Sequence, residues 1–90
     1  MAQPDITIYH MPFCPYCGWA KQLLDGKGAR YTLIDITGDD LLRGEMEDRS
    51  GRNTVPQIFI GEYHVGGFDD LSALERKGEL DPLLNGESPA

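Results

Sequence analysis

The connections between the expected strands constrain the fold of this chain more than any other feature. Alternating and β-branched residues predict strands over 5–10, 31–36, 57–60 and 63–65. A helical pattern over 15–26 separates the first two strands, and a crossover of this kind requires parallel strands. Gly61-Glu62 separates the last two strands and is a two-residue hairpin signal, which requires antiparallel strands. The sheet must therefore be mixed.

Two further helices complete the expected order βαβαββα. Asp39 or Asp40 can cap a second helix that runs to about Arg49, and Asp69 or Asp70 can cap a third that runs to about Lys77. The sequence thus predicts an α/β fold with a four-stranded mixed sheet flanked by three helices. We expect one domain over residues 1–84 and a short disordered tail over residues 85–90.

The two cysteines of the chain, Cys14 and Cys17, lie where the first strand gives way to the first helix. Helical positions i and i+3 share a face, so the two sulfurs can form and break a disulfide. Pro15 suits the first helical position, which places Cys14 at the positive end of the helix and favours its thiolate. The dipole alone contributes only about 0.3–1 kcal/mol. We therefore expect hydrogen bonds to the Cys14 sulfur, from the N–H of Tyr16 or Cys17 or from the Cys17 thiol.

Two other uses of these cysteines are weaker. A structural disulfide across so short a loop removes little chain entropy, and secreted disulfide frameworks usually carry four or more cysteines. A zinc site needs two further ligands, and the chain offers only His10 and His64 as histidines. Redox chemistry with no bound metal is the favoured interpretation.

The net charge of the chain disfavours some classes of binding partner. Fifteen acidic residues against eight Lys and Arg give a formal net charge of −7, which disfavours nucleic acids and anionic membranes. No apolar run approaches the ~20 residues that span a bilayer, and no signal-peptide pattern is present. A cytoplasmic monomer is the default expectation, and a reducing compartment suits a reversible disulfide.

Three motifs in order give the chain a resemblance to the dithiol glutaredoxins, over essentially residues 5–84. Cys14-Pro15-Tyr16-Cys17 matches the active site of that class, Thr54-Val55-Pro56 matches the loop with the cis-proline, and Gly66 to Asp70 match the glycine-rich turn. The resemblance implies a thioredoxin-like fold and a glutathione site beside Cys14. The residues implied to bind glutathione are Tyr16, Arg43, Thr54, Val55, Pro56, Gly67, Phe68, Asp69 and Asp70.

Several of these residues have a simpler alternative role. Asp69 and Asp70, implied to meet the γ-glutamyl end of glutathione, can also serve as helix caps. Pro56 can be an ordinary trans proline that opens a strand, and Tyr16 can be a rim aromatic. Met11 departs from the family pattern, because a Lys usually stands there and meets the glycyl carboxylate. Arg43 is expected to take over that carboxylate, although a lone helical Arg is often a solvated charge.

The resemblance implies a glutathione-dependent thiol–disulfide oxidoreductase. Cys14 would attack mixed disulfides of proteins with glutathione, and Cys17 would complete the reduction of protein disulfides. Client proteins that form a catalytic disulfide, with ribonucleotide reductase among them, are the implied partners. Two alternatives stay open: a dimer that holds a [2Fe–2S] cluster through Cys14 and glutathione, and an electron donor reduced by thioredoxin reductase.

Overall fold

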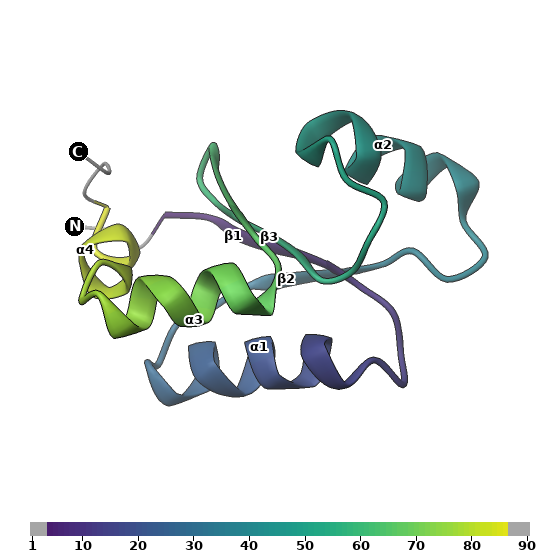
Figure 1. The fold of residues 1–90 in the computed structure, drawn as a ribbon. Helices are drawn as coiled ribbons and strands as arrows, with labels where there is room; N and C mark the ends of the chain where they lie inside the picture. The colour runs from purple at the N-terminus through teal and green to yellow at the C-terminus, as the bar shows by residue number, and fades with distance from the viewer. Residues whose placement is uncertain (1–3, 87–90) are drawn as a thin grey trace.

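The computed structural model describes residues 4–86 and contains one sheet with helices on both of its faces (Figure 1). The strands are β1 (Ile6–His10), β2 (Thr32–Asp35), β3 (Gln57–Ile60) and β4 (Tyr63–Gly66). The helices are α1 (Pro15–Gly26), α2 (Asp40–Ser50), α3 (Phe68–Arg76) and α4 (Leu80–Leu84).

The strand order β2-β1-β3-β4 confirms the mixed sheet. β1 pairs with β2 in parallel, as the intervening α1 requires, and pairs with β3 antiparallel. β3 and β4 form the expected hairpin, in which Ile60 faces Tyr63 and Gly61 takes a positive φ of 60°. The thioredoxin-like fold class is therefore confirmed.

Side-chain alternation along the strands produces two cores. On one face, Ile6, Ile8, Ile58 and Ile60 pack with buried leucines of α1, α3 and α4. On the other face, Tyr9 and Phe59 pack with Met46 of α2. Figure 1 shows the same arrangement, with α1 and α3 on one side of the sheet and α2 on the other. Cys14 and Cys17 lie at the end of the sheet where β1 leads into α1.

One helix begins earlier than the sequence predicted, and one short helix was not predicted. α3 begins at Phe68 with Gly67 as its N-cap, so neither Asp69 nor Asp70 is the cap residue. Asp70 instead stands at the third helical position and accepts a hydrogen bond from the Gly67 N–H at 2.9 Å. The short α4 was not predicted, because five residues show no helical period; its Leu80 and Leu83 are buried.

The expected tail over 85–90 falls outside the described residues from position 87 onward. Asn85 and Gly86 end α4 through backbone hydrogen bonds to Asp81, Pro82 and Leu83. Among residues 4–86, no helix has the length and apolar character needed to cross a membrane.

Candidate active site

The first turn of α1 presents the two thiols in different environments. Cys14 is the N-cap residue, and its sulfur accepts a hydrogen bond from the Cys17 N–H at 3.3 Å. This bond confirms one of the donors expected from the sequence. Cys14 is partly exposed, whereas Cys17 is only 1% exposed, and neither is in a disulfide. Cys14 is therefore the more accessible thiol of the pair.

The environment of Cys17 keeps it protonated. Burial, and secondarily its hydrogen bond with Cys14, raise the pKa of the Cys17 thiol to about 12. A hydrogen bond from the Met11 backbone opposes this shift, as does the charge of Lys21. The Cys17 thiol is therefore both buried and protonated.

The loop before β3 lies against Cys14. The Val55–Pro56 peptide bond is cis, as the resemblance implied. The Val55 carbonyl oxygen lies 3.9 Å from the Cys14 sulfur. Two of the three sequence motifs, separated by about forty residues, therefore meet at the Cys14 sulfur.

The glycine-rich turn at the start of α3 meets the same loop. A Cβ on Gly67 would lie 3.7 Å from the Pro56 carbonyl oxygen, so the two backbones are in close contact. Gly66 has a φ of 112°, and the Asp70 carboxylate occupies the space where its side chain would be. The turn is consequently built around a backbone position that only glycine fits.

Asp70 is held by two donors. Its Oδ2 accepts hydrogen bonds from the Gly67 N–H at 2.9 Å and from Arg52 Nη1 at 3.0 Å. The Gly67 hydrogen bond, and then Arg52, hold the pKa of the Asp70 carboxyl below its usual value. Asp69 is exposed in the first turn of α3. The turn therefore places two carboxylates at the N-terminal end of α3.

Arg43 reaches from α2 toward the same end of the molecule. Its guanidinium donates to the Asn53 carbonyl at 3.3 Å and lies 3.8 Å from the Met11 sulfur. The guanidinium therefore stands beside the position where the glutaredoxin pattern usually has Lys.

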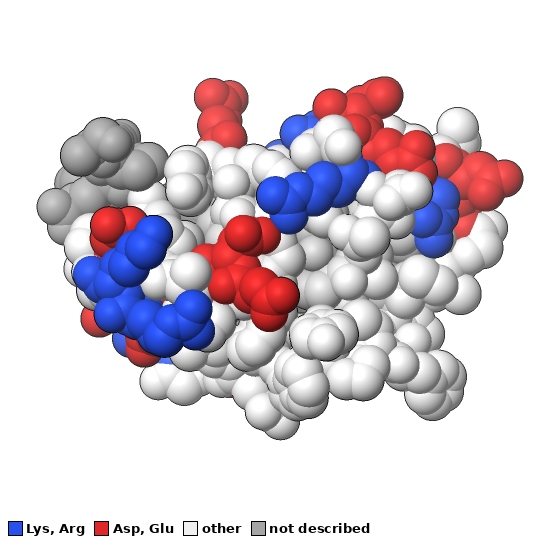
Figure 2. Space-filling view, in the orientation of Figure 1, with Lys and Arg blue, Asp and Glu red and all other residues white. Residues whose placement is uncertain are grey.

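Exposed aromatic side chains border the thiols. Tyr16 and Trp19 are 52% and 46% exposed and make an edge-to-face contact, and Trp19 also contacts Phe68. Phe13 is fully exposed, with a positive φ of 63°. On the face in Figure 2, uncharged side chains cover the N-terminal part of α1, whereas charges gather over α2 and over α3 with α4.

The structure brings most of the sequence-predicted site residues into one region through these contacts. Sequence reasoning did not identify Arg52, which pairs with Asp70, or the role of Gln57 and His64. Gln57 is fully buried and donates to both the carbonyl oxygen and the hydroxyl of Thr54, while His64 bonds to Gln57. The signal for Gln57 was available, because it is the single polar residue in the apolar run of β3.

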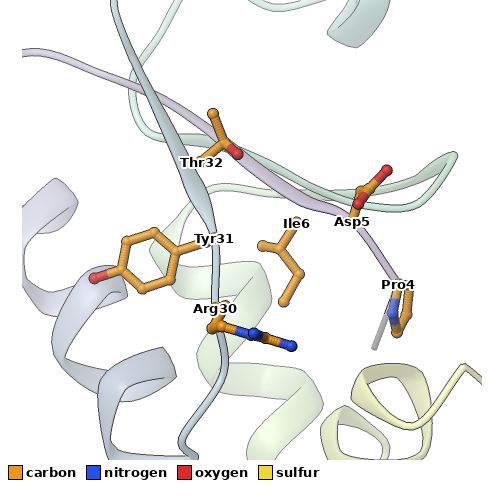
Figure 3. A pocket seen from close by; sticks show the side chains of 6 residues that line it. All are labelled: Pro4, Asp5, Ile6, Arg30, Tyr31 and Thr32. Atoms are coloured by element: carbon orange, nitrogen blue, oxygen red, sulfur yellow. The ribbon is translucent and has the colours of Figure 1, made fainter. Parts of the chain in front are cut away.

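Two hollows of the described part of the chain are lined by neither cysteine. A pocket of about 220 Å³ lies between the starts of β1 and β2, lined by residues that include Asp5, Arg30 and Tyr31 (Figure 3). A shallow groove of about 530 Å³ runs between α1 and α3, past Trp19, Phe68 and Ser72. Within residues 4–86, no three His, Cys, Asp or Glu side chains are grouped to hold a metal ion.

Comparisons with known proteins agree on one family. The Glutaredoxin family model matches residues 6–65. The glutaredoxin of Pseudomonas aeruginosa is 54% identical over 82 residues, which cover 91% of this chain and 98% of the relative. The solution structure of glutaredoxin from Brucella melitensis is 53% identical, with a TM-score of 0.84 over 99% of this chain and 98% of that one. A crystal structure of a buckwheat glutaredoxin–glutathione complex is 33% identical, with a TM-score of 0.85 over 93% of this chain and 78% of that one.

Proposed function

Because this chain belongs to the glutaredoxin family and is thus a thiol–disulfide oxidoreductase, we propose that glutathione is its reductant and that mixed disulfides of proteins with glutathione are its substrates. The observation that carries the proposal is the convergence of three segments on Cys14. Val55 lies beside the sulfur, Gly67 contacts Pro56, and Arg43 stands beside Met11. A tripeptide with two carboxylates and one ammonium group suits such a surface.

The proposed glutathione site uses the residues named from the sequence. The α-carboxylate meets the N–H groups of Phe68 and Asp69 at the start of α3, where Gly67 permits a close approach, and the ammonium group meets Asp69 and Asp70. The Thr54-Val55-Pro56 loop binds the glutathione backbone as a neighbouring strand would. Arg43 receives the glycyl carboxylate, and Tyr16 borders the sulfur. The buckwheat relative forms a crystalline complex with glutathione, which supports glutathione as the ligand.

The proposed chemistry consists of two exchanges. The Cys14 thiolate attacks the glutathione sulfur of the mixed disulfide, forms a Cys14–glutathione disulfide and releases the client thiolate, which takes up a proton. The thiolate of a second glutathione then attacks the glutathione sulfur bound to Cys14. Glutathione disulfide leaves and Cys14 is restored. The disulfide between client and glutathione is broken and one between the two glutathione molecules is formed, so each client thiol is restored at the expense of one molecule of reduced glutathione.

Protein disulfides require Cys17. Cys14 first forms a mixed disulfide with the client, and Cys17 then attacks the Cys14 sulfur and releases the reduced client. The proton of Cys17 passes to the departing thiolate. We propose that these clients, with ribonucleotide reductase as one candidate, dock on the exposed aromatic side chains of Phe13 and Tyr16. We also propose that the enzyme works as a cytoplasmic monomer.

Serine variants test the proposal in an assay coupled to glutathione reductase. We expect Cys14→Ser to lose all reduction of a cysteine–glutathione mixed disulfide. Cys17→Ser should retain much of the activity, because glutathione can replace the second thiol. Equal inactivity of both variants would contradict the route through glutathione, and activity with thioredoxin reductase alone would identify a different reductant.

A further inference from the structure

A polar chain buried at the sheet connects β4 to the proposed glutathione loop. Gln57 Nε2 donates to the Thr54 carbonyl oxygen at 3.0 Å and to Thr54 Oγ1 at 3.2 Å. Gln57 Oε1 lies 2.7 Å from His64 Nε2. Gln57 is 0% exposed, so its amide makes these bonds away from bulk water.

The chemistry of the partners fixes the orientation of the amide. The Thr54 carbonyl can only accept, so Gln57 must present its NH₂ group to Thr54 and its oxygen to His64. His64 must then carry a hydrogen on Nε2, which it donates to Gln57. Each member of the chain thereby determines the orientation of the next.

The far end of the chain is also held in place. The His64 ring stacks on Phe59, with centroids 4.8 Å apart and an interplanar angle of 28°. Phe59 is 3% exposed, and the Arg49 guanidinium lies 4.2 Å from its ring centroid. These hydrogen bonds therefore join residues of the sheet, Gln57 and His64, to the exposed Thr54 of the loop.

We propose that Gln57, oriented by His64, is a positioning residue that sets the Thr54-Val55 backbone at the separation from Cys14 that glutathione needs. This inference rests on the proposed function, because it assigns the loop to glutathione. The Val55 carbonyl lies 3.9 Å from the Cys14 sulfur, so a shift of the loop changes the width of the site directly. Neither Gln57 nor His64 touches the reacting sulfur.

The test measures the reduction of a cysteine–glutathione mixed disulfide. The rate at which iodoacetamide alkylates Cys14 is measured in parallel, because this reaction does not require glutathione to bind to the Thr54-Val55-Pro56 loop. Gln57→Met keeps the side-chain length but removes the amide. We expect its kcat/KM to fall about tenfold, mainly through a higher KM, while the alkylation rate changes less than about twofold. Gln22→Met removes an exposed amide from α1 and is the matched control, with activity unchanged.

His64→Phe removes the hydrogen bond to Gln57 but keeps an aromatic ring that can stack on Phe59. We expect a loss of about threefold in kcat/KM. The double variant with Gln57→Met should be no worse than Gln57→Met alone, since His64 acts through Gln57. Additive losses would overturn this order of action.

Two outcomes overturn the inference without touching the proposed function. One is a Gln57→Met variant with the wild-type kcat/KM, and the other is an equal fall of kcat/KM and alkylation, which would mark a general loss of structure. Amide hydrogen exchange at Thr54 and Val55 checks the loop without glutathione and should accelerate in Gln57→Met. A wild-type protein that is alkylated at Cys14 but inactive with glutathione would instead refute the proposed function.

Discussion

At the scale of single residues, burial separates the roles of two chemically identical thiols. Cys14 is partly exposed and caps α1, whereas Cys17 is 1% exposed and its pKa is raised to about 12. The spacing of the cysteines predicted this order, because a residue one turn into a helix lies deeper than its cap. The sequence could not indicate that Met11 would supply an opposing backbone hydrogen bond, since that contact depends on how the chain turns between β1 and α1.

Gly66 offers a sharp test at the same scale. A Cβ there would overlap the Asp70 carboxylate and lie 3.1 Å from Arg52 Nη1, and the φ of 112° is unfavourable for any other residue. We expect Gly66→Ala to lower the free energy of unfolding by at least about 2 kcal/mol in urea titrations at pH 7.

Gly67→Ala is the matched control for that substitution. Gly67 has a φ of −91°, and its Cβ would meet only ordinary van der Waals contact with Pro56. We expect a loss below about 1 kcal/mol. Equal losses at the two positions would show that the space behind Gly66 does not matter.

At the scale of elements, local signals predicted the four strands and the three longer helices, because each has either a clear period or a capping residue. The start of the third helix was predicted too late, because an Asp three residues past the cap gives the same signal as an Asp at the cap. The hydrogen bonds that link His64 through Gln57 to Thr54 could not be predicted from the sequence, since they depend on the register of β3 against β4. Single-sequence patterns fix elements more readily than contacts between them.

The start of α2 gives a prediction for an element. The Asp39 side chain accepts from the Leu42 N–H at 3.0 Å, and its backbone carbonyl accepts from the Arg43 N–H. We expect Asp39→Ala to lower the free energy of unfolding by about 1 kcal/mol, measured by circular dichroism in urea. Asp48→Ala, on an exposed turn far from the cap, should stay within about 0.5 kcal/mol of wild type. An equal loss in both variants would show that the cap is not the cause.

At the scale of the whole molecule, the two ends of the sheet have different characters. β1 ends beside the cysteines, whereas its start, with that of β2, borders the pocket in Figure 3. All the proposed chemistry therefore lies at one end, and the two cores between the helices support it. Substitutions at the opposite end should affect stability before they affect reaction rates.

Acid should destabilise the whole fold. Burial lowers the pKa of both His10 and His64 below the usual 6.5, and the charges of Lys21 and Arg52 act in the same direction, against weaker contributions from Asp35 and Asp70. The unfolded chain then binds more protons than the folded chain as the pH falls below about 6.5. We expect the free energy of unfolding to keep its full value well above pH 6.5 and to fall as the pH drops below 6.5, so that it is lower at pH 5.5 than at pH 7.5.

The control for this pH dependence is a double variant, His10→Gln with His64→Gln. Its free energy of unfolding, measured in urea at the same two pH values, should change less than that of the wild type. A wild-type stability that is equal at both pH values would contradict the prediction. Below about pH 3.8, protonation of Asp35 and Asp70 should remove further stability, because both carboxyls have lowered pKa values.

The aromatic cluster beside the thiols has a practical consequence. Trp19 is the only tryptophan of the chain, it lies two residues after Cys17, and it contacts both Tyr16 and Phe68. Its fluorescence emission therefore arises from one known place, in contact with two residues of the proposed glutathione site. The protein carries an intrinsic optical probe, with which ligand binding can be followed without any added dye.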